Sequence, residues 1–546
     1  MRDRQPRPAM QLRGPHGVRR RRGAKTVSLL IGLLAAAALA AHAGTAPPAR
    51  YGGTLVVRAA TDPGTLNGGI TTAAAAHTVA DSIFNGLVQL DEQLNPTPDL
   101  AERWTVSPDG RAYTFTLVRG VRWHDGRPLT SADVKFTYEQ VLLKYHARTR
   151  AGLEGVLAAV ETPDPGTVVF RFHRPFGALV QRADVTEAPI LPRHLYEGTD
   201  ILQNPSNAAP VGTGPFRFKE WTRGAQVTLV KNERYFKPGL PVVDQLTFRV
   251  LPQPALAVIA LERGEVDYLD AVPAPDVERL RTNRNLTMRP TLAGPGGSFC
   301  IGTLIPNLTR PPLDNLKVRQ AMYHAINRDF IVLAVLGGQG RVATAPISRG
   351  IRWAQHPGLP QVRYDVARAN ALLDDAGFAR GAGGVRFALT YPAATTQIRY
   401  AEVVRDNLRD VGIDVNVVPM EFTAATQRVF VRRDFDLAFA SYCNGPDPDI
   451  GVKRMYVSSN IQPIPFSNGA SYRNAAIDQL FDLAAGSLDL QERGRHYRAI
   501  QEILVRDLPY LWLVETFRYV GFHSGLRAVQ YWTGNVAERA YWAAPR

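Results

Sequence analysis

Hydrophobic and polar positions in the first half of the chain mostly follow the pattern of β-strands. Tyr113, Phe115 and Leu117 alternate with threonines, which is the period-two pattern of a half-buried strand. The residues from Thr130 to Asp133 have the form of a capping box, and apolar positions at helical spacing follow to about residue 144. Further strands are predicted at 53–60, 168–172, 227–230 and 245–251. The first half is therefore predicted to be largely sheet with short helices.

The second half alternates helices with strands. One long helix is predicted from a cap at Asp314 to Leu336, and another from a cap at Asp365 to about Gly377. Strand and helix patterns then alternate at 387–391, 398–411, 413–418, 422–432 and 436–442. This order is a βαβαβ unit, which predicts parallel strands in one sheet.

Ligands in sheets of this kind bind beyond the carboxyl ends of the strands. The loops that follow Tyr391, Val418 and Tyr442 are therefore candidate sites.

Composition is that of a soluble globular protein with several domains. The chain has 546 residues, of which 45% are hydrophobic and 21% charged, and at ordinary domain sizes that length predicts roughly three domains. Two cysteines, Cys300 and Cys443, exclude a disulfide-dense scaffold and a four-cysteine zinc site. One disulfide is compatible with the sequence, which does not show whether the two residues come within bonding range.

The first 43 residues have the pattern of a cleavable export signal. They contain nine Lys or Arg and one acid, or +8 of the formal +15, and the +7 of the remainder is dispersed, so no nucleic-acid partner is predicted. An apolar stretch from Val27 to Ala41 precedes a small-x-small site that ends at Ala43. A membrane anchor is the alternative, but this stretch is shorter than the roughly 20 residues needed to span a bilayer. We expect cleavage after Ala43 and export by either the general or the twin-arginine route.

Local motifs of the common catalytic sites are absent from the sequence: G-x-S-x-G, H-E-x-x-H, the P-loop, G-x-G-x-x-G and S-x-x-K. The nine histidines after residue 43 are scattered without an i, i+4 pair, so neither a metal site nor a cofactor is predicted. Asp447 and Asp449 directly follow a predicted strand. Two interpretations of this pair are open: carboxylates that act as acid and base or bind a cation, and Asp-Pro dipeptides that build a rigid turn.

Short sequence blocks spread over nearly all of the mature chain occur in the order of one known family. These blocks are PDLA at 98–101, SPDG at 107–110, RGVRWHDG at 119–126, GTGPF at 212–216, GEVD at 264–267, VRQA at 318–321 and DPD at 447–449. The chain thereby resembles the peptide/nickel type (family 5) periplasmic substrate-binding proteins of ABC transporters.

This resemblance implies an α/β fold of the two-lobed periplasmic binding protein type (type II, large cluster), with an inserted subdomain in the first lobe. The boundaries by similarity are a signal peptide at 1–43, a first lobe at 44–84, 208–295 and 512–546, an insertion at 85–207 and a second lobe at 296–511. It implies a monomeric periplasmic protein without catalysis or cofactor. Its partners would be a peptide or other small solute and an ABC permease in the inner membrane.

Position 444 departs from the pattern of many peptide-binding relatives, in which an aspartate pairs with the free α-amino group of the peptide. Asn444 stands there in this chain. An amide supplies no negative charge, so a buried ammonium would lose a charge-assisted hydrogen bond worth about 1.5–3 kcal/mol. A blocked peptide, a sugar derivative or an opine-like solute is then expected, unless Asp447 or Asp449 supplies the charge.

The mechanism implied is hinge closure, in which a solute that contacts both lobes stabilises the closed form. Predicted ligand contacts are Thr61, Asn67, Thr71 and Thr72 from the first lobe and Tyr391, Tyr442, Asn444, Asp447 and Asp449 from the second. Two alternatives stay open: an exported hydrolase that uses Asp447 and Asp449 as paired carboxylates, and an accessory receptor that senses its ligand.

Overall fold

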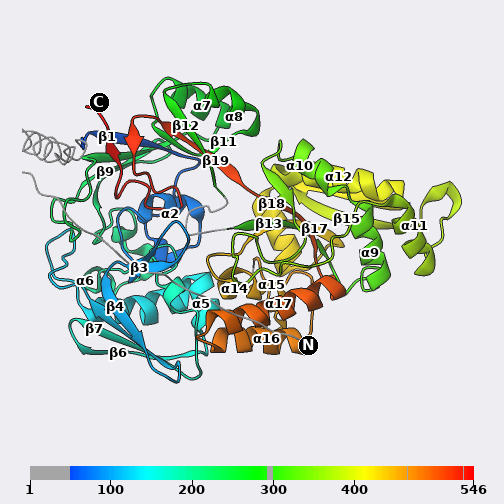
Figure 1. Ribbon diagram of the computed structural model, residues 1–546, viewed down its shortest axis with the longest axis horizontal. Coiled ribbons are helices and arrows are strands. Elements are labelled where there is room, and N and C mark those ends of the chain that lie inside the picture. Colours follow the sequence, from blue (N-terminus) through cyan, green and yellow to red (C-terminus); the bar gives the residue numbers. More distant parts are fainter. Residues whose placement is uncertain (1–49, 292–298, 464, 533, 546) are drawn as a thin grey trace, which may run out of the picture. The chain divides into compact units, whose positions relative to one another are not determined.

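The computed structural model describes residues 50–291, 299–463, 465–532 and 534–545 (Figure 1). The chain divides into two units, Met1–Ala49 and Arg50–Arg546, and the fold given below is that of the second. The predicted export signal at 1–43 lies outside the described residues. None of the helices in the described ranges has the length and apolar character needed to cross a membrane.

A seven-stranded mixed sheet brings together segments from the beginning, the middle and the end of the described chain. Its spatial order is β12 (Leu286–Thr291), β19 (Arg518–His523), β11 (Tyr268–Val272), β1 (Thr54–Ala59), β10 (Gln245–Val250), β9 (Gln226–Lys231) and β8 (Phe216–Thr222). β1 runs parallel to β10 and β11, and the remaining pairs are antiparallel. These strands confirm the predictions at 53–60, 227–230 and 245–251.

Two helices, α7 (Pro254–Glu262) and α8 (Ala274–Arg281), lie beside β11 and β12 (Figure 1). Their apolar side chains form one buried cluster with those of the two strands. This end of the seven-stranded sheet therefore has its own small core.

A second, antiparallel sheet is formed by β4 (Ala101–Val106), β5 (Ala112–Leu117), β7 (Thr167–Phe172) and β6 (Leu157–Asp164), in that order. The alternation seen in the sequence is confirmed, because Tyr113, Phe115 and Leu117 are all buried. The capping box between Thr130 and Asp133 is also confirmed. The helix that it opens runs through α3 (Ser131–Phe136), a π-helical turn (Thr137–Leu142) and α4 (Leu143–Tyr145).

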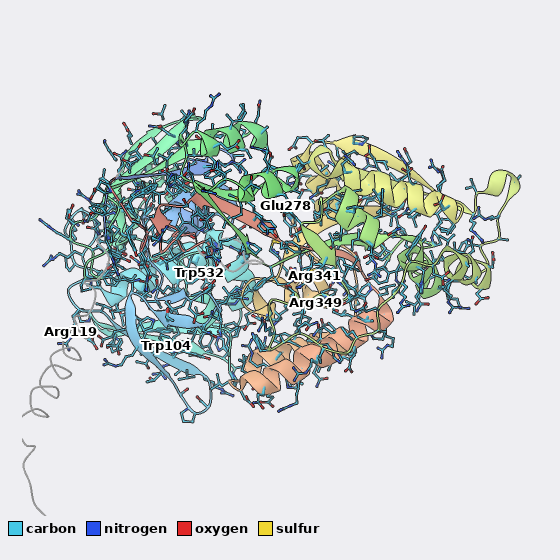
Figure 2. The ribbon with its side chains drawn as sticks, turned by 45° about the horizontal axis from the view of Figure 1, so that its top comes forward. Trp104, Arg119, Glu278, Arg341, Arg349 and Trp532 are labelled. Carbon is cyan, nitrogen blue, oxygen red and sulfur yellow. A yellow bond between two sulfur atoms is a disulfide. The ribbon has the colours of Figure 1, made fainter. Side chains whose placement is uncertain are left out.

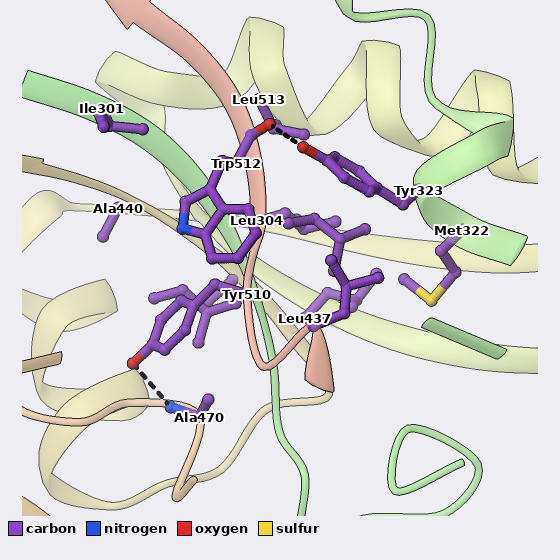
Figure 3. Close-up of a cluster of buried hydrophobic side chains, with 14 of the residues drawn as sticks. Ile301, Leu304, Met322, Tyr323, Leu437, Ala440, Ala470, Tyr510, Trp512 and Leu513 are labelled. Carbon is purple, nitrogen blue, oxygen red and sulfur yellow. Dashed lines mark hydrogen bonds between the residues drawn. The ribbon is translucent and has the colours of Figure 1, made fainter. Parts of the chain in front are cut away.

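A third sheet has the order β14 (Gly340–Val342), β18 (Leu511–Thr516), β13 (Cys300–Pro306) and β17 (Leu437–Cys443), with all neighbours antiparallel. Trp512 of this sheet is buried beside Tyr510, Leu304 and Leu437, and the hydroxyl of Tyr323 donates to its carbonyl at 2.9 Å (Figure 3). The chain leaves this sheet after Thr516 and returns to the seven-stranded sheet with β19.

The predicted βαβαβ elements are present, but their strand pairing differs from the prediction. β15 (Phe387–Ala394) and β16 (Ile413–Met420) are parallel, and α12 (Ile398–Asp410) connects them. β17 follows α13 (Phe422–Thr426) and a π-helical turn (Gln427–Val431), yet it pairs antiparallel with β13. The residue before it, Asp436, keeps a backbone hydrogen bond from its N–H to the carbonyl of Thr390 in β15. The prediction of one parallel sheet with three strands was therefore wrong in its third pairing.

The single long helix predicted from Asp314 to Leu336 is two helices. α9 (Leu316–Ala325) is capped by Asn315, and α10 (Arg328–Ala334) is capped by Asn327, whose side chain accepts from the N–H of Phe330. The backbone N–H of Asn327 donates to the side chain of Asn407 at 2.9 Å. This tertiary contact and the new cap stabilise a break that hydrophobic spacing does not reveal. The second predicted helix is confirmed as α11 (Val366–Asp375) with Asp365 as its cap.

A disulfide between Cys300 and Cys443 joins the start of β13 to the end of β17. The two residues face each other in the strand register and are 143 positions apart in sequence. The bond therefore fixes the end of β17 directly before the loop that contains Asn444.

The other α-helices and strands, most of them short except α16 and α17, complete the described fold. They are α2 (Ala74–Ala80), β2 (Val88–Leu90), β3 (Pro96–Pro98), α5 (Ala147–Leu153), α6 (Arg193–Tyr196), α14 (Pro448–Gly451), α15 (Lys453–Tyr456), α16 (Ala475–Gly486), α17 (Leu490–Asp507), β20 (Leu526–Arg527) and β21 (Tyr541–Trp542).

Candidate functional site

Asn444 is fully buried in the loop that follows β17, and both the oxygen and the nitrogen of its side-chain amide are hydrogen-bonded. Its Oδ1 accepts a hydrogen bond from the backbone N–H of Ser348 at 2.7 Å, and its Nδ2 donates to the carbonyl of Pro346 at 3.2 Å. Its own N–H donates to the carbonyl of Phe299 at 2.6 Å. The amide therefore joins the end of β17 to the 346–348 segment.

The 346–349 segment is held from its other side by the buried carboxylate of Glu515 in β18. The Oε1 atom of Glu515 accepts from the hydroxyl of Ser348 and, at 3.0 Å, from the N–H of Arg349. Its Oε2 atom pairs with Nε of Arg341 at 2.6 Å. Figure 2 labels Arg341 and Arg349 on the side of the 299–516 region that is turned toward the label of Trp532 in that view. Sequence patterns did not single out these four residues, because they come together from β14, a loop and β18.

Replacing Asn444 with aspartate is expected to lower the free energy of unfolding by about 1–3 kcal/mol. The carboxylate would put an acceptor where Nδ2 now donates to the Pro346 carbonyl. That carboxylate oxygen and the Pro346 carbonyl oxygen would then both lack a donor. Urea unfolding followed by fluorescence measures the effect. Asn285→Asp, at an exposed position, is the matched control, and equal stability of the two variants would contradict this role for the amide.

Asp447 is fully buried and caps the short helix α14. Its Oδ1 accepts from the N–H of Asp449 at 2.9 Å, as expected for a residue at a helix N-terminus. The guanidinium of Arg493 in α17 pairs with it, with Nη1 2.8 Å from Oδ2 and Nη2 3.0 Å from Oδ1. Burial opposes the charge on Arg493, but Asp447 outweighs that effect and raises the pKa of Arg493.

Asp449 is also buried and pairs with a different arginine. Nη2 of Arg182 lies 2.9 Å from its Oδ2 and donates to its carbonyl at the same distance, and Lys453 lies 3.5 Å from Oδ1. Burial alone would raise the pKa of Asp449, but Lys453 and Arg182 outweigh it and lower the pKa. Each of the two carboxylates is therefore matched to cations within the protein, which corresponds to the turn-building interpretation. No observation favours their use as a hydrolytic pair.

Two of the predicted first-lobe contacts form local turns. Asn67 is buried, its Oδ1 accepts from the N–H of Gly69 at 2.9 Å, and its Nδ2 donates to Asn207 at 2.8 Å. The hydroxyl of Thr71 accepts from the N–H of Ala73 at 3.1 Å. These interactions account for the polar character of both positions.

Thr61 and Thr72 are exposed. Their side chains are therefore accessible to a solute, unlike that of Asn67.

Tyr391 lies in β15 and borders a small pocket of about 20 Å³. Apolar side chains, several of them aromatic, form most of the lining of this pocket, and Gln397 and Thr426 supply its polar part. The hydroxyl of Tyr391 is buried without a hydrogen-bond partner. Burial raises the pKa of Tyr391, so the phenol stays protonated and is available as a donor. The aromatic lining is formed by Phe422, Phe430, Phe439 and Phe466.

Tyr442 lies in the core rather than at this pocket's edge. It is fully buried, and its hydroxyl donates to the carbonyl of Ser467 at 3.2 Å. Its ring makes edge contacts with Phe466 and Tyr510. Tyr391 and Tyr442, which end the first and third strands of the predicted unit, therefore have different surroundings.

Among the described residues, no group of three or more His, Cys, Asp and Glu side chains is arranged to hold a metal ion.

Comparison with known proteins gives consistent matches over most of the chain. The sequence model described as "Bacterial extracellular solute-binding proteins, family 5 Middle" matches residues 95–463. The oligopeptide-binding protein AppA of Bacillus subtilis is 30% identical over 500 residues, which cover 88% of this chain and 90% of AppA. The glutathione-binding protein GsiB of Salmonella choleraesuis is 30% identical over 453 residues, which cover 82% of this chain and 85% of GsiB.

Solved structures agree with the sequence matches. The structure of Bacillus subtilis AppA in complex with a nonapeptide superimposes with a TM-score of 0.77 at 26% identity, covering 91% of this chain and 100% of that one. The fold is therefore the two-lobed α/β fold that the sequence predicted.

Proposed function

Because this chain belongs to the family 5 bacterial extracellular solute-binding proteins, we propose that it captures a peptide or peptide-like small solute and delivers it to an ABC transporter permease. The match to an oligopeptide-binding protein over 88% of the chain carries this proposal. The protein would act as an exported monomer, with its signal peptide removed after Ala43 and its solute held between the two lobes.

Binding without chemistry is the form of this function that the site supports. Asp447 and Asp449 are both buried and ion-paired to arginines, so neither is free to exchange a proton with a bound substrate. The exposed side chains of Thr61 and Thr72 and the unpaired hydroxyl of Tyr391 are our proposed contacts to the solute. Asn67, Thr71, Tyr442 and Asn444 would then shape the site without touching the solute.

A peptide that binds only the native state, present at a free concentration of 100 times its dissociation constant, is expected to raise the free energy of unfolding by about 2.7 kcal/mol. The measurement is a thermal-shift titration of the mature chain with mixed tripeptides, followed by chromatography of the recovered peptides. We expect a concentration-dependent rise in Tm and peptides of unchanged mass.

Sustained cleavage beyond one equivalent would contradict the proposal. In that case the double variant Asp447→Asn with Asp449→Asn would show whether these carboxylates are responsible.

A further inference from the structure

A cavity of about 30 Å³ lies between residues 81–99, residues 184–186 and the C-terminal segment 530–538. Its wall includes Trp532, whose ring also packs against the main hydrophobic cluster of the 299–514 region. Figure 2 shows Trp532 on the side of its own region that faces Arg341 and Arg349. The cavity is therefore close to the place where the C-terminal segment 530–538 contacts the 299–514 region.

Hydrogen-bond acceptors without partners line this cavity. Oδ1 of Asp184, Oε1 of Gln530 and Oδ1 of Asn535 are all buried atoms to which no donor is bonded. The side chains of Asp184 and Gln530 belong to residues that are only 5% and 8% exposed. An unsatisfied buried acceptor is costly, so three around one cavity indicate an occupant that supplies donors.

Three side-chain donors that line the cavity are bonded elsewhere. The hydroxyl of Thr186 donates to Asp81 at 2.9 Å, Nδ2 of Asn85 donates to Asp99, and Nε1 of Trp532 donates to the carbonyl of Leu90 at 3.3 Å. These three donors are therefore not available to the unpaired acceptors, which an occupant carrying N–H groups would satisfy.

The charges around the cavity favour a cation as that occupant. Asp81 pairs with His77, and Asp99 pairs with Lys237, which also pairs with Glu538. Asp184 has no such ion pair among the described residues, and its Oδ2 accepts only a long backbone hydrogen bond from Thr186 at 3.2 Å. Burial, followed by the nearby charges of Glu187 and Asp81, raises the pKa of Asp184 to about 7.

We propose that this cavity receives the primary ammonium group of the solute, with the Asp184 carboxylate as its counter-ion and the oxygens of Gln530 and Asn535 as its other acceptors. A primary ammonium has three N–H donors, which equals the number of unpaired acceptors. The volume suits a group of that size. This inference rests on the proposed function.

The same assignment explains how an amine-bearing solute is compatible with asparagine at position 444. The Asn444 amide is bonded to Ser348 and Pro346, and Asp447 and Asp449 are paired with arginines. Asp184, in the segment predicted as the inserted subdomain, then supplies the negative charge from the other side of the site.

The test compares a random tripeptide mixture with the same mixture N-acetylated, by thermal shift and calorimetry at pH 7.5. Wild-type protein is expected to bind the free-amine mixture about 10- to 150-fold more tightly, the range expected for one charge-assisted hydrogen bond. Asp184→Asn should remove that preference while leaving the affinity for the acetylated mixture unchanged. Glu278→Gln, at an exposed carboxylate (Figure 2), is the control and should keep the preference.

The pH dependence gives a second readout. With an Asp184 pKa of about 7, lowering the pH from 7.5 to 5.5 protonates the carboxyl and should weaken binding of the free-amine mixture by up to about 25-fold. His77, Asp81, Tyr138, Arg148, Arg182 and Glu187 also face this region. Asp184→Asn separates their effect, because it should flatten the pH dependence only if Asp184 is the titrating group.

A separate thermal-shift titration with methylammonium chloride tests whether the cavity binds a free primary ammonium rather than that of a peptide. Tetramethylammonium chloride at equal ionic strength, which has no N–H donors, is its control. Equal binding of both peptide mixtures would overturn the inference and leave the proposed function intact. If neither mixture bound but methylammonium stabilised wild type and not Asp184→Asn, the proposed peptide function would fail and the cavity would be a free-cation site. Insensitivity to every probe would overturn the inference as well.

Discussion

Arg493→Met is expected to lower the free energy of unfolding by about 3–5 kcal/mol. The change leaves the Asp447 carboxylate fully buried without the guanidinium that now lies 2.8 Å from it. A buried charge without its partner costs far more than the pair itself contributes. Guanidinium chloride unfolding measures the change, and Arg495→Met, at an exposed position in the same helix, is the control.

A double variant separates the cost of the unpaired charge from the loss of packing. Asp447→Asn combined with Arg493→Met should be more stable than Arg493→Met alone, because it removes the uncompensated carboxylate. If the double variant were less stable than the single one, the burial of charge would not be the cause of the loss.

Replacing both Cys300 and Cys443 with serine is expected to lower the free energy of unfolding by about 3–5 kcal/mol. The disulfide connects residues 143 positions apart, and closing so long a loop restricts the unfolded chain strongly. Reduced wild-type protein should unfold at the same denaturant concentration as the variant, and reductant should leave the variant unchanged. Equal stability of the oxidised wild type and the variant would contradict this expectation.

Sequence patterns predicted most elements of the fold but not all of their partners. The alternation at Tyr113, Phe115 and Leu117 and the cap at Asp365 were sufficient, because each depends on a few adjacent residues. The pairing of β17 with β13 and the break at Asn327 depend on contacts with distant segments. Periodicity carries no information about those contacts, so the third strand of the predicted parallel sheet and the single long helix were wrong, whereas the parallel pairing of β15 with β16 was confirmed.

The candidate site shows the same division. The position of Asn444, Asp447 and Asp449 in a loop after a strand made them candidates, and the structure adds what each side chain contacts. No sequence motif marks Glu515 or Asp184, because a single carboxylate in a strand or loop cannot be distinguished from a surface residue by sequence alone. Glu515 is buried and bonded to Ser348, and Asp184 is buried at a cavity that it shares with Gln530 and Asn535, so these neighbours of both residues are more than 100 positions away in sequence.

The Arg182–Asp449 pair has a consequence for how the molecule can open. It links the segment predicted as the insertion to α14 of the other region, and each side chain is 1% exposed. Separating the two side chains into water would lose their attraction but would restore the hydration that burial removes, so the two effects largely offset each other. If the proposed closure of the lobes breaks this contact on opening, both charges would be hydrated in the open form and buried again in the closed form.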